Sequence, residues 1–203
     1  MSMRMRRIVL DFLSVNCYLL INEQAGDALV IDPGSAAGKI FSAIEAENAR
    51  PVGILLTHAH VDHVSAVAEV AEKYSAPVWI HPDDYGIYFS KYNELPPYMM
   101  APEGLPQPVK DCPTAGLDFQ ILHTPGHTPG GVCYYFPAEK MVFTGDTLFC
   151  GTYGRTDFPG GSDEDIFNSI RNVLFKLPED TRVYPGHEQA TTIGKEQGNP
   201  VFM

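Results

Sequence analysis

Apolar and polar positions change along this chain in short blocks, which predicts strands interleaved with helices. Apolar runs of strand length occupy residues 6–22, 27–34, 51–57, 76–80, 119–124, 132–136, 141–146 and 182–187. Apolar residues recur at helical spacing in residues 38–49, 64–74 and 162–178, and residues 191–200 have room for a last short helix. Residues 6–22 have the pattern of two paired strands. The alternation predicts an α/β fold, with sheets covered by helices.

Residues 91–115 stand apart because they carry six prolines and little periodicity. This predicts a long surface loop, and loops of this length often serve as lids over functional sites. Apolar segments resume on both sides of the loop, so we expect one domain over residues 1–203.

Composition excludes several classes of partner. The 203 residues carry a net charge of −11, which argues against nucleic acid and anionic membranes as partners. No apolar run approaches the roughly 20 residues of a membrane span, and the basic N-terminus lacks the pattern of a signal peptide. The four cysteines contain no C-x-x-C pair and read as reduced thiols, so a cytoplasmic protein is expected. The pattern does not indicate an oligomeric state.

Residues that can bind metals follow several of the predicted strands. The run 51–57 leads directly into His58, His60, Asp62 and His63, and later runs lead into His127, Asp146 and His187, each directly after a glycine. Ligands collect at the carboxyl ends of strands in α/β sheets. These segments are therefore expected to meet at one end of the fold.

The spacing within the first segment separates its residues into two pairs. His58 and His60 are two positions apart, so both rings point the same way in an extended backbone and can share one metal. Asp62 and His63 come where the chain turns into a helix and can serve a second metal. The donors are nitrogen and oxygen without thiolate, which suits Zn²⁺ best and tolerates Fe or Mn. We therefore expect two divalent metal ions.

Four stretches in order, "THAHVDH", "HTPGHTPGG", "FTGDTLF" and "YPGH", resemble the metallo-β-lactamase superfamily over nearly the whole chain. The resemblance implies a four-layer αβ/βα sandwich with a binuclear metal site at the edge between the two sheets. It also implies a set of ligands: His58, His60 and His127 for one metal, Asp62, His63 and His187 for the other, and Asp146 as the bridge.

Two further stretches, "GTYGRTDFPGGS" and "PGHEQATTIGKEQGNPVF", are most similar to the short glyoxalase II-like (hydroxyacylglutathione hydrolase-like) enzymes. Those enzymes cleave S-acylglutathione thioesters such as S-lactoylglutathione, so the resemblance implies an enzyme with a small-molecule thioester substrate. The chain ends about 16 residues after His187, so the C-terminal helical domain that helps full-length glyoxalase II hold glutathione is expected to be missing.

The mechanism implied by the resemblance is attack on the thioester carbonyl by a hydroxide that bridges the two metals. Asp146 and Asp62 would be the catalytic carboxylates, Asp146 as the bridge and Asp62 as a ligand that can act as a base in a singly loaded site. Arg155 and Tyr153 would contact substrate, since Arg155 suits a carboxylate such as that of glutathione. Pairing of Arg155 with Asp157 is an equally good interpretation.

Three other polar residues lie near strand ends. His123 is expected to orient a ligand rather than to bind metal, and His81 to be structural. Asp32, in "DPG", is expected to pair with a ligand histidine, with a turn former as the alternative.

Three rival functions remain open at this point. "FTGD" and "GRTDF" also resemble the iron-dependent glutathione persulfide dioxygenases of the superfamily, which would use a single iron. β-Lactam hydrolysis fits less well, because true metallo-β-lactamases do not place an aspartate at the position of Asp146. A non-catalytic module stabilised by metal fits least, because structural zinc sites are closed and rich in cysteine.

Overall fold

The computed structural model describes residues 2–202, which form two compact units. The first unit contains the residues up to Ile80 together with Tyr85–Asp118. The second contains His81–Asp84 together with the residues from Phe119 onward. The chain therefore passes from the first unit to the second at His81–Asp84 and returns to the first unit at Tyr85. The single domain expected from the sequence would span both units, and it stays a prediction.

The first unit is built on a five-stranded mixed sheet in the order β1-β2-β3-β4-β5. The first three strands are antiparallel, and β3, β4 and β5 are parallel. The strands are β1 (Met3–Val9), β2 (Asn16–Asn22), β3 (Asp27–Ile31), β4 (Arg50–Leu55) and β5 (Val78–Trp79). The helices are α1 (Ala37–Ala46), α2 (Val61–Val64), α3 (Val67–Tyr74) and α4 (Tyr85–Tyr88).

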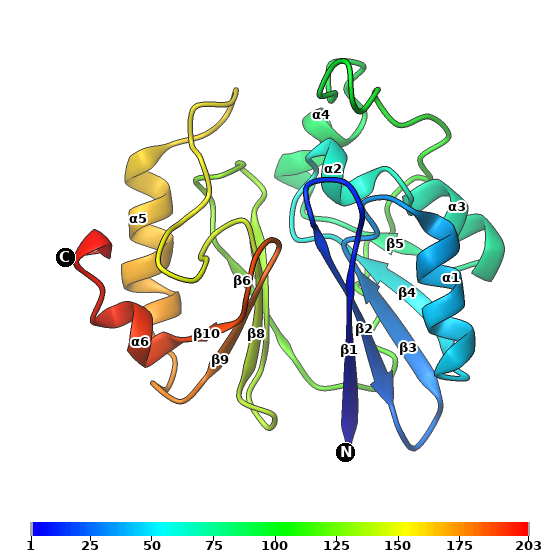
Figure 1. The fold of residues 1–203 in the computed structure, drawn as a ribbon, viewed down its shortest axis with the longest axis horizontal. Coiled ribbons are helices and arrows are strands. Elements are labelled where there is room, and N and C mark those ends of the chain that lie inside the picture. Colours follow the sequence, from blue (N-terminus) through cyan, green and yellow to red (C-terminus); the bar gives the residue numbers. More distant parts are fainter. Residues whose placement is uncertain (1, 203) are drawn as a thin grey trace. The chain divides into compact units, whose positions relative to one another are not determined.

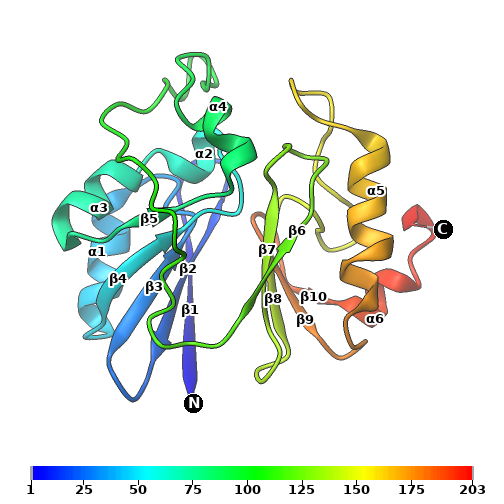
Figure 2. The same cartoon turned by 180° about the vertical axis from the view of Figure 1, so that it is seen from behind.

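Helices α1 and α3 lie side by side against one face of this sheet (Figures 1 and 2). Ile40 and Ile44 of α1, and Val67 and Val70 of α3, are fully buried in one hydrophobic cluster with alternate residues of the strands. The helical spacing of apolar residues is therefore what fixes these helices to the sheet. The loops that follow β3 and β4 carry the polar residues discussed below.

The second unit is built on a second five-stranded mixed sheet, in the order β10-β9-β8-β7-β6. Only β8 and β9 pair in parallel among its described strands. The strands are β6 (Gln120–His123), β7 (Val132–Phe136), β8 (Met141–Gly145), β9 (Arg182–Pro185) and β10 (Thr191–Thr192). The helices are η1 (Pro82–Asp84), α5 (Asp163–Asn172), η2 (Leu174–Lys176), α6 (Ile193–Gln197) and η3 (Pro200–Phe202).

Helix α5 packs on one face of the second sheet through Ile166 and Ile170, which are completely buried with Val142 and Val183. Its start follows the sequence closely, because the Ser162 hydroxyl accepts the amide of Asp165 at 3.2 Å and caps the helix. The expected strands of this unit and the capped start of the helix are confirmed, but the helix expected over residues 162–178 ends at Asn172 and the 3-10 helix η2 follows it.

Two other local features differ from the sequence prediction. The helix expected over residues 64–74 is two helices, α2 and α3, which are separated at Ser65 and Ala66. Helix α2 already begins at Val61, with His60 in an extended conformation at its N-terminal boundary. The second difference is that η1 and α4 occupy residues 82–88, where no periodic pattern announced a helix.

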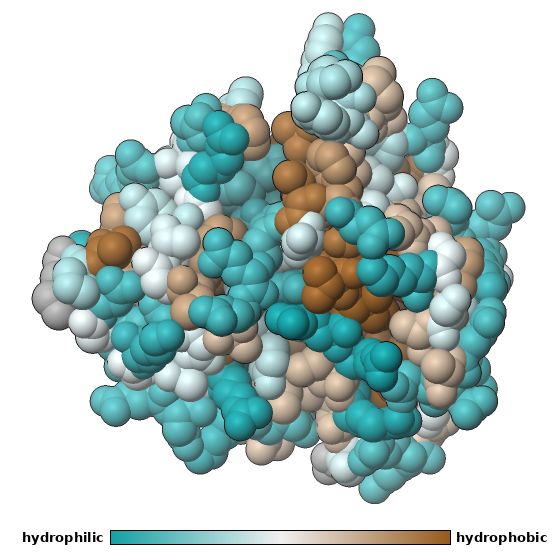
Figure 3. All heavy atoms as spheres, in the orientation of Figure 1, coloured by the Kyte–Doolittle hydropathy of each residue, from teal (hydrophilic) through white to brown (hydrophobic). Residues whose placement is uncertain are grey.

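The segment 91–115 is a loop, as predicted, and over its length the structure has one isolated bridge, Leu95 to Met99, but no helix or longer strand. Its side chains Tyr92, Tyr98 and Met100 are between 68% and 76% exposed, and Tyr98 contacts Phe12 with ring centroids 6.0 Å apart. In Figure 3, hydrophobic surface is concentrated over elements of the first unit. The loop thus contributes exposed apolar groups to the first unit. Across residues 2–202, no helix has both the length and the apolar character that a membrane span requires.

Candidate metal centre

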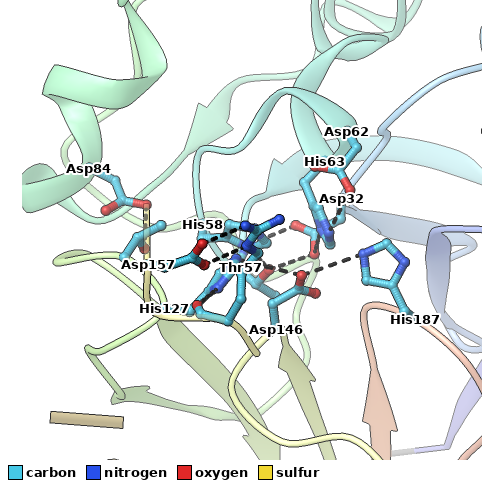
Figure 4. A network of polar contacts seen from close by, with 12 residues as sticks. Asp32, Thr57, His58, Asp62, His63, Asp84, His127, Asp146, Asp157 and His187 are labelled. Atoms are coloured by element: carbon cyan, nitrogen blue, oxygen red, sulfur yellow. Dashed lines mark hydrogen bonds and ion pairs between the residues drawn. The ribbon is translucent and has the colours of Figure 1, made fainter. Parts of the chain in front are cut away.

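The stretch from His58 to His63 forms a compact cluster of side chains in the first unit, at the end of β4 (Figure 4). His58 and His63 are 2% and 0% exposed, and their ring centroids lie 4.1 Å apart. The ring of His60 meets that of His58 edge-on at 4.9 Å. Asp62 lies in the first turn of α2, with Oδ2 at 3.8 Å from Nε2 of His63. We call His58, His60, Asp62 and His63 the first cluster.

The buried carboxylate of Asp32 supports the first cluster through hydrogen bonds. Its Oδ1 accepts the amide of Thr57 at 2.8 Å, and its Oδ2 accepts the Thr57 hydroxyl at 2.6 Å. Nδ1 of His63 lies 3.0 Å from the same Oδ2, so Nδ1 carries the proton and donates it. Because the Thr57 hydroxyl donates to Asp32, its oxygen accepts from Nδ1 of His58 at 3.1 Å. Both imidazoles are therefore left with Nε2 as the nitrogen that can bind a cation.

A glycine permits the close packing that this arrangement needs. A Cβ atom on Gly34, in the turn after β3, would lie 1.7 Å from the carbonyl oxygen of Asp62. Asp32 itself has a φ of +50°, in the left-handed region that aspartate tolerates better than most residues. The "DPG" turn is thus shaped to bring the Asp32 carboxylate against the first cluster.

Three separate turns form a corresponding cluster in the second unit. His127 follows β6, Asp146 follows β8 and His187 follows β9. Oδ2 of Asp146 lies 3.5 Å from Nε2 of His127 and 3.4 Å from Nε2 of His187 (Figure 4). One carboxylate oxygen therefore faces two imidazole nitrogens. We call His127, Asp146 and His187 the second cluster.

A backbone carbonyl supports the second cluster, whereas a side-chain carboxylate supports the first. Nδ1 of His127 donates to the carbonyl oxygen of Arg155 at 2.7 Å, which fixes Nε2 as its acceptor nitrogen. The residue before Arg155 is Gly154, where a Cβ atom would lie 1.8 Å from the carbonyl oxygen of Asp146 and 3.1 Å from Nδ1 of His127. Only a glycine fits between these two groups.

The donor atoms of both clusters fit divalent metal ions. His63 and His127 both donate through Nδ1 to protein oxygens, so Nε2 is the nitrogen of each ring that faces a carboxylate oxygen, of Asp62 and Asp146 respectively. Two acceptors that face each other repel unless a cation lies between them. Imidazole and carboxylate together suit zinc, iron or manganese.

Three of the four cysteines are poor candidates for this donor set. All four are free thiols, and burial raises the pKa of Cys133 and that of Cys112 to about 12. Burial, with a smaller contribution from the charge of Asp32, also raises the pKa of Cys17 well above its usual value. A thiol must lose its proton to bind a metal, so burial disfavours these three as ligands.

Comparison with known proteins now decides the family. A model of the metallo-beta-lactamase superfamily matches residues 10–187, which include both clusters. The chain belongs to the metallo-beta-lactamase superfamily. Among its relatives, the hydroxyacylglutathione hydrolase GloC of Haemophilus influenzae is 34% identical over 201 residues, covering 93% of this chain and 92% of GloC.

Two solved structures of similar proteins cover almost the whole chain. The crystal structure of BLEG-1 B3 metallo-beta-lactamase has a TM-score of 0.88 at 34% identity and covers 98% of this chain and 100% of that one. The crystal structure of TTHA1623 in a di-iron-bound form has a TM-score of 0.84 at 39% identity and covers 96% and 98%. The predicted metallo-β-lactamase fold is confirmed. The metal of this member of the superfamily is not fixed by its relatives, since one of them holds iron.

The two predicted substrate contacts have different surroundings. The guanidinium of Arg155 donates through Nε and Nη2 to Asp157, both at 2.6 Å, and lies 4.0 Å from the centroid of the Phe158 ring. The pairing alternative is therefore realised, although the Arg155 side chain is still 56% exposed. The Tyr153 ring packs against Phe167, 4.9 Å between centroids, at the edge of the core of the second unit. Packing explains Tyr153, and its contact with substrate stays a prediction.

The other predicted polar residues have clear structural partners. Asp32 contacts the predicted ligand His63, as expected. His123 donates through Nε2 to the carbonyl oxygen of Pro129 at 2.9 Å, in the turn after His127, which agrees with an orienting role. His81 stacks on His123 with the ring planes 11° apart. Burial, and then the neighbouring His123, lower the pKa of His81, so the neutral form of His81 is favoured.

Sequence reasoning missed three residues that bind the turns of the two clusters. Thr57 bridges Asp32 and His58, and Asn93 donates its side-chain amide to the carbonyl oxygen of Ala59 at 2.7 Å. Asp84 is completely buried and binds the turn after His127. Thr57 was detectable as the polar residue that ends a buried strand, whereas no local pattern marks Asn93 or Asp84.

Proposed function

We propose that this chain is a binuclear metal-dependent hydrolase that cleaves a small thioester of the S-acylglutathione type. The observation that carries the proposal is the position of Oδ2 of Asp146, 3.5 Å and 3.4 Å from the Nε2 atoms of His127 and His187. A carboxylate oxygen that serves two imidazoles is suited to bridging two cations. The similarity to GloC, which is named a hydroxyacylglutathione hydrolase, supports the choice of substrate.

The proposed ligand set joins the two clusters. One metal would be held by His58, His60 and His127, and the other by Asp62, His63 and His187, with Asp146 shared by both. Membership of the superfamily supports this assignment, as do the contact of Asp62 with His63 in the first unit and those of Asp146 with His127 and His187 in the second. Zinc suits these donors best, and iron remains the principal competitor because TTHA1623 binds it.

Divalent cations in such a site supply Lewis acidity, which brings the pKa of a water near 7 and polarises a carbonyl group. The residues of this chain prepare the donor atoms. Asp32 and the Arg155 carbonyl accept from the Nδ1 atoms of His63 and His127, so Nε2 is the nitrogen that each ring can offer to a metal. Asp62 and Asp146 supply the negative charge of the site, and Asp62 would accept a proton in a singly loaded form.

Arg155 is the proposed substrate-binding cation, with Tyr153 as a second contact. The Arg155 guanidinium is already bound by Asp157, and the carboxylate of a glutathione-like substrate would join or replace that contact. The free thiols and the acidic charge support a cytoplasmic enzyme without nucleic acid or membrane partners.

Two other reactions have an observation in their favour. A neighbour that holds iron shows that a similar protein can bind this metal, so the iron-dependent reaction with glutathione persulfide is one alternative to test. The similarity to BLEG-1 makes β-lactam hydrolysis a second alternative. Each reaction consumes a different substrate and releases a different product, so one panel of assays distinguishes the three reactions.

The test begins with purified protein whose bound metals have been measured by elemental analysis. Hydrolysis of S-lactoylglutathione is compared with that of other acyl thioesters, with nitrocefin as the β-lactam, and with oxygen uptake on glutathione persulfide. We expect turnover of a glutathione thioester with two metals bound. Oxygen uptake with one iron per chain, or no thioester turnover with two metals bound, would refute the proposal.

A further inference from the structure

The segment His81–Asp84 brings a buried carboxylate to the turn that carries His127. The segment follows β5 but belongs to the second unit. The Asp84 side chain is 0% exposed. Its Oδ1 accepts the amide of Gly130 at 2.6 Å, and its Oδ2 accepts the hydroxyl of Thr128 at 2.9 Å (Figure 4). Both donors lie within three residues of His127, on its C-terminal side.

A carboxylate in this position needs a reason, because an ionised group away from water is stable only when its oxygens are well bonded. Both oxygens of Asp84 receive a hydrogen bond here. The turn also leaves room for the carboxylate, since a Cβ atom on Gly130 would lie 2.6 Å from the Asp84 amide nitrogen and 2.7 Å from its Oδ1. Gly130 therefore allows the backbone to approach Asp84 closely enough for a short, charge-assisted hydrogen bond.

Other contacts of this turn involve its carbonyl groups. Ser162 donates its amide to the Gly126 carbonyl at 2.8 Å, and the Ser169 hydroxyl donates to the Pro125 carbonyl at 2.7 Å. His123 donates to the Pro129 carbonyl at 2.9 Å. These contacts hold the carbonyl groups of residues 125–129. Asp84 differs because it is charged and because it binds donors of the turn.

We propose that Asp84 is a positioning residue that holds the turn of residues 127–130, and thereby keeps Nε2 of His127 aimed at Oδ2 of Asp146. The role rests on the proposed function, in which His127 and Asp146 bind the same metal. Thr128 connects the two residues, because it follows His127 directly in the chain and its hydroxyl donates to Asp84. Nδ1 of His127 is fixed separately by the Arg155 carbonyl, so Asp84 acts on the position of the ring and not on its tautomer.

The experiment compares Asp84→Asn with Asp180→Asn, an aspartate of the same unit whose side chain is 60% exposed and pairs with Lys140, which is not part of this network. Asparagine can still accept the Gly130 amide, but its NH₂ group then faces the Thr128 hydroxyl. Zinc affinity is measured by competition with a chromophoric chelator, and the ligand field is followed by the visible absorption of the cobalt-substituted protein. We expect Asp84→Asn to weaken zinc binding by about 10–100-fold, as for other residues that support a metal ligand, and to change the cobalt spectrum. Asp180→Asn should change neither.

Thr128→Val and Thr128→Ser keep the test decisive if Asp84→Asn does not fold. Valine removes the hydroxyl with little change in shape, whereas serine keeps it. We expect Thr128→Val to weaken zinc binding and shift the cobalt spectrum, and Thr128→Ser to restore both. Wild-type affinity and an unchanged spectrum in every folded variant at position 84 or 128, with only a lower melting temperature, would overturn the proposal and leave Asp84 a stabilising residue.

His127→Ala, measured in parallel, distinguishes this failure from failure of the proposed function. If His127→Ala weakens zinc binding while the Asp84 and Thr128 variants do not, the positioning role alone is refuted. If His127→Ala binds zinc as tightly as the wild type, the proposed ligand set is wrong, and the positioning role falls with it.

Discussion

The first cluster comes from six consecutive residues, 58–63, whereas the second cluster comes from three turns that lie far apart in the sequence. The two clusters also differ in what supports them. The buried side chain of Asp32 fixes His63 in the first, and the carbonyl of Arg155 fixes His127 in the second. In both, a glycine lies against the backbone of the aspartate, Gly34 at Asp62 and Gly154 at Asp146.

In both clusters an imidazole directs Nε2 at a carboxylate. The two clusters differ in whether a side chain or a backbone group holds that imidazole. The support of the first cluster is one side chain and can be removed by a single substitution. The support of the second is a backbone group, which substitution does not remove, and its weak points are the turns that carry it. The predictions below use this contrast, from the largest expected effect to the smallest.

Asp146→Ala should cause the largest loss, because Asp146 is the proposed ligand of both metals. Several kcal/mol of Lewis-acid stabilisation would be lost, which corresponds to about 10³-fold in kcat/KM. His123→Ala is the control in the same unit, since His123 contacts the turn but is not a proposed ligand. Thioester hydrolysis by the two variants is the measurement, and equal losses would show that the ligand set is wrong.

Asp32→Asn should have an intermediate effect that acts through His63. The asparagine NH₂ group would face Nδ1 of His63, so that nitrogen would become the acceptor and the proton would move to Nε2, where the metal binds. We expect zinc affinity to fall by about 10–100-fold. Asp11→Asn, whose side chain is 76% exposed, is the matched control and should bind zinc as the wild type does. Unchanged affinity in Asp32→Asn would mean that the first cluster does not depend on this carboxylate.

Arg155→Ala should have the smallest effect on chemistry and act on binding. Loss of a charge-assisted hydrogen bond predicts a rise in KM of about tenfold with kcat nearly unchanged. Asp157→Asn should lower KM, because the competing carboxylate is neutralised. A fall in kcat at constant KM in Arg155→Ala would contradict a binding role.

The same pair predicts how this effect depends on pH. The hydrogen bonds from Arg155 lower the pKa of Asp157 to about 2. Because the folded-state pKa lies below the usual value, the stability that the pair contributes is present above that usual value and is lost only as pH falls through about 2. The competition between Asp157 and a substrate carboxylate should therefore be constant over any pH range in which the enzyme is assayed. The measurement is the pH profile of KM for Asp157→Asn against the wild type.

The contrast between the clusters also explains what the sequence could and could not predict. The strands, α1 and the capped α5 follow from local periodicity and from Ser162, and the residues of the first cluster are neighbours in the chain. The local sequence does not predict the break between α2 and α3, because the two residues at the break are Ser65 and Ala66, and neither is a helix-breaking glycine or proline. That break reflects tertiary structure: the amide of Ala66 donates to the carbonyl of Pro33, at the "DPG" turn, and not within a continuous helix.

Asp84 illustrates the limit most clearly. Its partners, Thr128 and Gly130, lie more than forty positions away, and "HPDDYG" has two adjacent aspartates of which one is exposed and the other fully buried. Nothing in the local pattern distinguishes them. Asn93 is similar, because its contact with Ala59 joins a proline-rich loop to the first cluster across 34 positions. Such contacts depend on long-range packing, which periodicity does not encode.

The most direct test of the central claim is the number of metal ions that the chain binds in the wild type and in Asp146→Ala, measured by elemental analysis after dialysis against a metal buffer. The account predicts two divalent ions per chain in the wild type, and fewer than two, bound more weakly, when the shared carboxylate is removed. One ion per chain in the wild type, or two ions held equally tightly by Asp146→Ala, would contradict it.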